Sequence, residues 1–199
     1  MLKRGFDIVA SLIGIILVSP VLIATALLVA FKDGSPVIFT QTRVGKNQKP
    51  FRIYKFRTMA TSTKDALQIT AGNDMRITVL GAVLRRTKLD ELPQLFNVLK
   101  GDMSLVGPRP EVPKYVALWS DEQRTEILSV RPGITDRTQL KFLNEEQILA
   151  ASPDPENTYI NEIMPMRLAM CEDYIKTRNF VDDIAILLAT IQKLLLRKR

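Results

Sequence analysis

The sequence contains no histidine and a single cysteine, Cys171. The lack of histidine excludes a serine–histidine or cysteine–histidine nucleophile and a histidine-based metal site. One cysteine cannot form an intrachain disulfide, which is typical of a reducing compartment, and it disfavours a structural zinc site. We predict that Cys171 is a small buried side chain rather than a nucleophile. Carboxylates remain as the candidate acids and bases, and the metal that suits them is a hard ion such as Mg2+.

Glycine-rich phosphate-binding patterns are also missing, because neither Gly45 nor Gly81 lies in a P-loop or a dinucleotide fingerprint. The chain shows no alternation of strands and helices, which disfavours a Rossmann domain. Positive charge, in contrast, is plentiful: 28 lysine and arginine residues against 21 acidic ones give a net charge of +7. This excess implies an anionic partner, which could be nucleic acid, anionic lipid or a nucleotide. A length of 199 residues suits one domain with a full hydrophobic core.

Residues 8–31 form a nearly unbroken apolar run. A straight helix of this length would measure about 36 Å, enough to cross a bilayer. Ser19 and Pro20 interrupt the run at its midpoint, where proline removes a backbone donor and serine can satisfy the freed carbonyl. Basic residues flank both ends, so the positive-inside rule gives no clear orientation. The residues alone leave open a membrane-spanning helix and a re-entrant helix that returns to the face it entered.

The C-terminal run, residues 184–196, is too short to span a membrane and ends in three basic residues. It is predicted to be an amphipathic helix that either lies on the membrane surface or packs on the core. Residues 37–44 and 51–59 are rich in β-branched and aromatic side chains, and the turn-forming residues 45–50 separate them. This pattern predicts a β-hairpin.

Most of the remaining chain is predicted to be helical. Residues 79–99 have helical spacing and are expected to form two helices that meet near residues 88–90 and end at Gly101. Residues 107–110 (GPRP) cannot be regular structure and should hold Arg109 in a fixed place. Further helices are predicted over the following ranges: 111–130, 167–177 and 182–196.

Asp90 and Glu91 form the most informative pair. They follow Arg85, Arg86 and Lys88 and precede Pro93, which suits the first turn of a helix. The carboxylates are therefore predicted to lie at a helix start, where the backbone dipole favours negative charge and N–H groups bind anions. Acid, cations and a helix terminus together suggest chemistry on a phosphate. Helix capping with local salt bridges is the structural alternative.

The surrounding motifs resemble those of the bacterial monotopic phosphoglycosyl transferases. Residues 88–95 (KLDELPQL) and 97–111 (NVLKGDMSLVGPRPE) are similar to their core signature, and residues 131–135 (RPGIT) resemble the next motif. Residues 3–7 (KRGFD), the Ser19-Pro20 break and residues 55–59 (KFRTM) also fit, so the resemblance covers nearly the whole chain in order. Its length resembles the small members, which consist of the catalytic core.

The resemblance implies a reaction and a place. Such enzymes move a phosphosugar from a UDP-sugar to a polyprenol phosphate such as undecaprenyl phosphate, and UMP leaves. The reaction is the first membrane step of surface glycan assembly, so downstream glycosyltransferases are expected partners. It takes place at the bacterial inner membrane, with the catalytic domain on the cytoplasmic face.

The resemblance also implies a fold. The expected fold is mixed and predominantly α, with a small β-hairpin. Residues 1–31 form a re-entrant membrane helix broken at Ser19-Pro20, and residues 32–199 form a compact, cytosol-facing catalytic domain with interfacial amphipathic helices.

By position, the family's nucleophile and metal-binding aspartate corresponds to Asp90, paired with Glu91. Asp90 is expected to form an aspartyl-phosphosugar and to help bind Mg2+. Glu91 either deprotonates the incoming phosphate or orients the metal. The predicted phosphate contacts are all cationic residues: Arg85 and Arg109 first, then Lys88 and Arg57.

The chain departs from the family after Thr135, where a glycine and an apolar residue are usual and Asp136-Arg137 stand here. Arg137 is a candidate for contact with the nucleotide phosphate, and solvent exposure of the Asp136-Arg137 pair is the alternative. The rival function is a non-catalytic membrane-surface protein that binds anionic lipid through its basic hairpin and C-terminal helix. Nucleic-acid binding is disfavoured, because few aromatics lie among the cations and the membrane segment would have no role.

Overall fold

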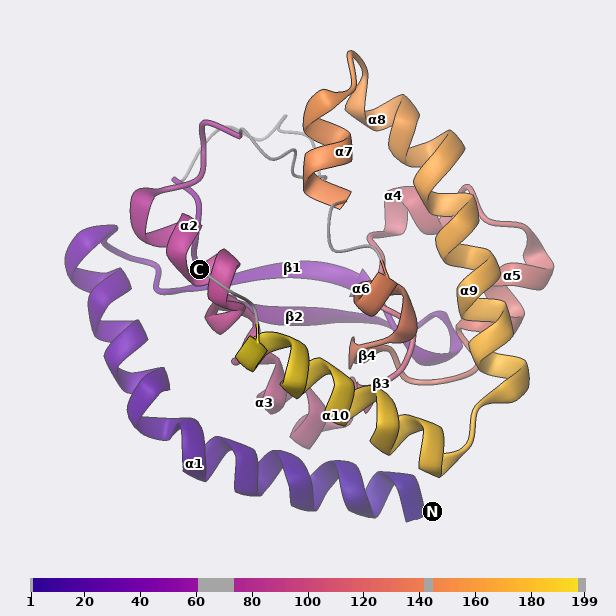
Figure 1. The fold of residues 1–199 in the computed structure, drawn as a ribbon, viewed down its shortest axis with the longest axis horizontal. Helices are drawn as coiled ribbons and strands as arrows, with labels where there is room; N and C mark the ends of the chain where they lie inside the picture. The colour runs from indigo at the N-terminus through magenta and orange to yellow at the C-terminus, as the bar shows by residue number, and fades with distance from the viewer. Residues whose placement is uncertain (1, 61–73, 142–144, 197–199) are drawn as a thin grey trace.

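The computed structural model describes residues 2–60, 74–141 and 145–196. It is mostly helical, with one two-stranded antiparallel hairpin at its centre and a long N-terminal helix along one edge (Figure 1). The first elements are α1 (Leu2–Lys32), β1 (Ile38–Val44), η1 (Lys46–Gln48), β2 (Pro50–Phe56), α2 (Val79–Thr87), η2 (Leu89–Glu91), α3 (Gln94–Lys100) and β3 (Ser104–Val106). The later ones are α4 (Pro113–Val116), α5 (Asp121–Ile127), β4 (Gly133–Thr135), α6 (Arg137–Lys141), α7 (Glu145–Ala151), α8 (Pro155–Thr158), η3 (Tyr159–Ile163), α9 (Met164–Thr177) and α10 (Phe180–Leu196).

Helix α1 bends at its midpoint. Figure 1 shows it running beneath α3 and α10 and then turning up along the left side towards α2. Pro20 has no N–H for the carbonyl of Ile16, and the hydroxyl of Ser19 donates to that carbonyl instead, at 2.8 Å. Serine therefore satisfies the freed carbonyl as predicted, but α1 continues through Pro20, so Ser19-Pro20 marks a bend and not a break.

The first half of α1 is fastened to the rest of the molecule by polar side chains. Arg4 donates to the carbonyls of Val98 and Leu99, at 2.7 and 3.1 Å, where α3 ends. The buried carboxylate of Asp7 accepts from the Ser104 hydroxyl at 2.8 Å and from the Leu105 N–H at 3.1 Å. Because these partners lie in α3 and β3, the bonds fix α1 against two separate elements.

The second half of α1 packs through apolar contacts. Val29 is fully buried with Phe56 of β2 and Leu84 of α2. The opposite side of α1 is exposed and apolar, and α1 is the one helix within the described ranges that is long and apolar enough to cross a membrane. The division of the chain at residue 31 stays a prediction, since both halves of α1 pack on the domain that follows.

The hairpin is confirmed, with Thr40 opposite Tyr54 in the antiparallel register. The two helices predicted to meet near residues 88–90 are α2 and α3, and Gly101 ends α3 with a positive φ of 96°. The predicted helix over residues 111–130 is wrong, because the chain forms α4 and α5 instead. Ser120 starts α5 as its N-cap in a capping box with Gln123.

A short parallel pair, β3 with β4, was not predicted. It brings Gly107 against Gly133: a Cβ on Gly133 would lie 2.1 Å from the Gly107 nitrogen. Both positions therefore need glycine, and the residues after β3 are held close to those around β4. This contact places residues 107–110 beside residues 133–136.

At the C-terminus, α9 and α10 agree with the predicted helices and are separated at Arg178 and Asn179 as expected. Helix α10 lies above α1 in the view of Figure 1 and contacts β3, β4 and α6. It buries Ile186 against the core and exposes Leu188 and Ile191. Packing on the core is therefore confirmed, and contact of the exposed apolar face with the membrane surface stays a prediction. Cys171 lies against the core with its pKa raised to about 12 by burial, as predicted for a structural thiol.

Candidate active site

Asp90 and Glu91 lie in the three-residue turn η2 between α2 and α3. Lys88 ends α2 in the left-handed conformation, with φ of 59°, and this turns the chain into η2. Pro93 then precedes α3, which begins at Gln94. The acidic pair is near a helix start as predicted, but it occupies its own turn rather than the first turn of α3. The turn buries both carboxylates, with residue exposures of 5% and 7%.

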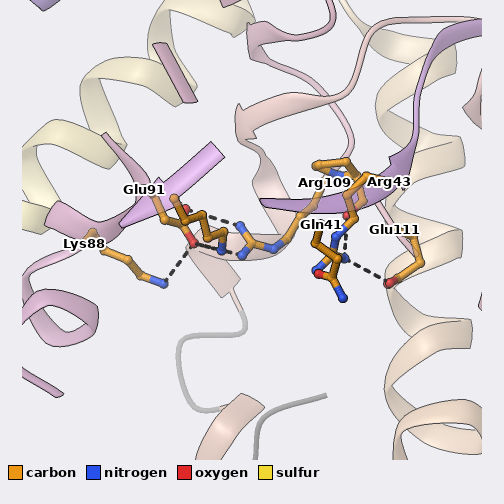
Figure 2. A network of polar contacts seen from close by, with 8 residues as sticks. Gln41, Arg43, Lys88, Glu91, Arg109 and Glu111 are labelled. Carbon is orange, nitrogen blue, oxygen red and sulfur yellow. Dashed lines mark hydrogen bonds and ion pairs between the residues drawn. The ribbon is translucent and has the colours of Figure 1, made fainter. Parts of the chain in front are cut away.

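Glu91 is surrounded by cations from three parts of the chain. Its Oε1 accepts from Lys55 Nζ at 3.0 Å and from Arg109 Nη2 at 2.9 Å, and Lys88 Nζ lies 4.0 Å away. Figure 2 shows Glu91 between Lys88 and Arg109. Burial opposes ionisation, but Arg109, Lys55 and Lys88 outweigh it and hold the pKa of Glu91 well below its ordinary value. Glu91 is therefore ionised and forms ion pairs with all three cations.

Asp90 has the opposite environment. Its Oδ1 is buried and has no hydrogen-bond partner among the described residues. Burial raises the pKa of Asp90, assisted by the neighbouring charge of Glu91, while Lys55, Lys88 and Arg85 act in the other direction. Burying a carboxylate oxygen without a hydrogen bond costs folding free energy. Such an atom therefore calls for an explanation, and a ligand that binds at this oxygen would provide one.

Lys55 contacts the acidic pair, although the predicted set of site residues omitted it. It is the last but one residue of β2, and its ammonium reaches Glu91. Burial lowers its pKa to about 8, against the opposing effect of Glu91. The family-like motif of residues 55–59 contains both Lys55 and Arg57, and a phosphate contact is predicted for Arg57 alone of the two.

Arg57 occupies a different place. Its guanidinium donates to the carbonyls of Asp33, Gly34 and Ser35, in the segment that joins α1 to the hairpin. Arg57 is 6% exposed. These contacts give Arg57 a structural role, and the geometry offers no support for the prediction that it contacts phosphate.

The other predicted cations divide into two groups. Arg85, Lys88 and Arg109 lie around the acidic pair. The positive charges of Arg85 and Lys88 favour the ionised form of Asp90, and Arg109 forms an ion pair with Glu91. Arg137 instead forms ion pairs with Asp173 of α9 and Asp182 of α10, at 3.2 and 3.1 Å. The structure therefore does not bring Arg137 together with the acidic pair.

The loop of residues 107–110 has no regular structure, as predicted, and it holds Arg109 from both sides. The Arg109 N–H donates to Asp136 Oδ2 at 3.2 Å, and Arg43 donates to the Pro110 carbonyl at 3.1 Å. Figure 2 shows the polar network continuing past Arg109 to Arg43 and Glu111. The solvent-exposed alternative for Asp136 is wrong, because this residue is 3% exposed.

A magnesium ion would fit Asp90. The parts of the chain with defined structure contain no group of three or more His, Cys, Asp or Glu side chains that could cage a metal. Mg2+ does not need such a cage, since it is usually held by one or two carboxylates together with substrate phosphates. The free Oδ1 of Asp90 meets that requirement.

Comparison with known proteins gives a consistent result. A sequence model of the bacterial sugar transferase family matches residues 1–197. One relative is the UDP-N-acetylgalactosamine-undecaprenyl-phosphate N-acetylgalactosaminephosphotransferase of Aeromonas hydrophila, which is 40% identical to this chain over 199 residues. The aligned region covers 98% of this chain and 44% of the relative.

Two relatives share the name UDP-glucose:undecaprenyl-phosphate glucose-1-phosphate transferase. The protein of Escherichia coli (strain K12) is 38% identical over 201 residues, 97% of this chain and 40% of its own length. The protein of Caulobacter vibrioides is 37% identical over 197 residues, 97% of this chain and 69% of its own length. The chain thus spans less than half of two of these three relatives. Their names agree on undecaprenyl phosphate and differ in the sugar.

Proposed function

Because the chain belongs to the bacterial sugar transferase family, we propose that it transfers a phosphosugar from a UDP-sugar to a polyprenol phosphate such as undecaprenyl phosphate, with release of UMP. The observation that carries this proposal is the buried, unpartnered Oδ1 of Asp90 beside a Glu91 that three cations surround. This combination supports a nucleophilic role for Asp90, because positive charge that can bind a diphosphate lies next to it.

Asp90 acts as the nucleophile. A carboxylate oxygen attacks the sugar-bearing phosphorus, a new oxygen–phosphorus bond forms, and the bond to UMP breaks with its electron pair leaving on UMP. The polyprenol phosphate oxygen then attacks the same phosphorus and releases Asp90. Burial makes this carboxylate more basic than an exposed one, and therefore a stronger nucleophile.

The cations around Glu91 bind and neutralise the phosphates. Arg109 offers a planar guanidinium that suits phosphoryl oxygens, and Lys55 and Arg85 add positive charge. A bound Mg2+ would neutralise further charge on the diphosphate, with Asp90 as its protein ligand. A carboxylate whose pKa lies well below the ordinary range is a weak base, which disfavours Glu91 as the group that deprotonates the incoming phosphate. Its role is instead to orient Lys55 and Arg109, with which it forms ion pairs.

Helix α1 enters and leaves the membrane on the same face. Its first half is fixed to α3 and β3 by Arg4 and Asp7, and its second half packs on β2 and α2 through Val29. A straight span would carry one half of the helix away from the domain, whereas the bend at Pro20 allows both halves to keep these contacts. The catalytic domain then lies on the cytoplasmic face of the inner membrane, where UDP-sugars and downstream glycosyltransferases are available.

A screen of UDP-sugars for UMP release tests this function. The protein is reconstituted with undecaprenyl phosphate and Mg2+, and Asp90→Asn is the matched inactive control. The expected result is release with one or a few sugars, dependent on Asp90. Salt-sensitive liposome binding with no UMP release from any sugar would instead support a non-catalytic membrane-surface protein.

A further inference from the structure

Hydrogen bonds join the loop that carries Arg109 to the segment around β4, and three of them involve residues 107–109. Two of them are between backbone groups: Gly133 N–H donates to Pro108 O at 2.9 Å, and Gly107 N–H donates to Thr135 O at 3.1 Å. The third joins the Arg109 N–H to the Asp136 side chain, at 3.2 Å. Unlike the first two, the third bond depends on a side chain, and it acts on the residue whose guanidinium reaches Glu91.

The Asp136 carboxylate is itself held in place. Asp136 is 3% exposed and directly precedes α6. The Thr138 hydroxyl donates to the same Oδ2 at 2.6 Å, so this oxygen is fixed while it accepts from Arg109. Burying a carboxylate is costly unless it is hydrogen-bonded, and a bond to an ionised acceptor is stronger than a neutral one.

We propose that Asp136 is a positioning residue for the reaction, which fixes the main chain of Arg109 so that its guanidinium meets the phosphates. This inference rests on the proposed function. Asp136 anchors Arg109 at its N–H, and Arg43 anchors the next residue through the Pro110 carbonyl. Only the side-chain torsions of Arg109 then remain to be set, and Glu91 accepts from its Nη2 at 2.9 Å.

Loss of the hydrogen bond from the Arg109 N–H to Asp136 should slow the transfer reaction, because Arg109 would be positioned less well. Asp136→Ala leaves the Arg109 N–H without its acceptor and loosens the loop, and we expect kcat/KM to fall about tenfold or more because small displacements of a phosphate-binding group are costly. Asp136→Asn keeps an amide oxygen at the same position. We expect this variant to retain activity within about threefold of the wild type, since the geometry of the acceptor survives.

A double-mutant cycle separates positioning from general stability. If Asp136 acts through Arg109, then adding Asp136→Ala to Arg109→Ala should lower UMP release no further, whereas independent effects would multiply. Ser120→Ala is the matched structural control. It removes the N-cap hydroxyl of α5, which accepts from the Gln123 N–H within that helix rather than from the loop of residues 107–110. Its kcat/KM should stay at the wild-type value.

Hydrogen–deuterium exchange on the full chain provides a readout that does not need activity. Asp136→Ala should speed exchange in peptides that contain residues 107–110, while Asp136→Asn and Ser120→Ala should not. Absence of UMP release by the wild type would overturn the proposed function, and the exchange result would still decide the role of Asp136. An active wild type with multiplicative losses in the cycle, or with unchanged exchange in Asp136→Ala, would overturn the positioning role.

Discussion

Two of the regions that bury a carboxylate differ in how completely that carboxylate is hydrogen-bonded. At the start of α1, Asp7 accepts two hydrogen bonds and Arg4 donates two, all to groups of the chain itself. In η2, Asp90 is just as buried, but its Oδ1 has no partner in the described parts of the chain. The first region holds the fold together. In the proposed function, the second keeps a reactive group available at some cost in stability.

The largest effect should come from removing the unpaired carboxylate. Asp90→Asn removes the nucleophile while keeping the shape of the side chain, and we expect UMP release to fall by more than about a thousandfold, since loss of a nucleophile typically removes most of the catalysis. UMP release from the UDP-sugar identified in the screen measures this. A variant with near-normal release would mean that another group attacks the phosphorus.

The same variant should be more stable than the wild type at neutral pH. The folded-state pKa of Asp90 is raised above its ordinary value of 3.8, so ionisation of this group disfavours the folded state once the pH is above that range. Asparagine removes this cost. The gain in unfolding temperature should therefore be present at pH 7 and shrink towards pH 3.8, where the wild-type carboxyl is protonated. A loss of stability at pH 7 would contradict the comparison.

The satisfied region should respond in the opposite way. Asp7→Ala leaves the Ser104 hydroxyl and the Leu105 N–H without an acceptor, and we expect it to cost about 3 kcal/mol of stability. Thermal unfolding in detergent measures the change. Asp121→Ala is the control, because this carboxylate is exposed and its pair with Arg124 should contribute less than about 1 kcal/mol. Equal losses in the two variants would remove the basis for treating Asp7 as an anchor.

Glu91 lies between these extremes, since it is fully paired but lies in the site. Glu91→Gln keeps a hydrogen-bond acceptor and removes the charge that orients Lys55 and Arg109, so we expect kcat/KM to fall about thirtyfold. If Glu91 is instead the base that deprotonates the polyprenol phosphate, the loss should be confined to the second half-reaction. Separate measurement of UMP release and of lipid-linked product distinguishes the two roles.

The smallest effect is expected at the bend of α1. Ser19→Ala removes the hydroxyl that donates to the Ile16 carbonyl and should cost about 1 kcal/mol, because one hydrogen bond is lost and α1 keeps its packing. The re-entrant topology should survive this change. Cysteines placed at residue 2 and after Lys32 should be labelled from the same side of the membrane, in the variant as in the wild type. Labelling from opposite sides would show a spanning helix.

Sequence patterns predicted the elements that have strong local signals. The hairpin follows from β-branched residues on both sides of a turn, and the bend of α1 follows from Pro20 in an apolar run. The β3–β4 pair was missed because three-residue strands are too short to show a period, and it depends on the contact between Gly107 and Gly133.

The candidate site was predicted in part for a related reason. Asp90, Glu91 and Arg109 stand in distinctive motifs, and the structure brings them to one place. Lys55 and Arg57 were harder to distinguish because they are two residues apart in one basic stretch. Strand β2 ends at Phe56, and beyond that point the chain directs Arg57 to the carbonyls that follow α1. Tertiary contacts of this kind cannot be read from alternation within a strand.

The most direct test of the central claim is mass spectrometry of the protein after incubation with the active UDP-sugar and Mg2+ in the absence of polyprenol phosphate. We predict that the wild type gains the mass of one phosphosugar on the peptide that contains Asp90, with release of one UMP, and that Asp90→Asn gains none. Later addition of undecaprenyl phosphate should remove the phosphosugar from the protein and allow further turnovers. Efficient transfer to the lipid with no adduct on this peptide, or with an adduct at another residue, would contradict the account.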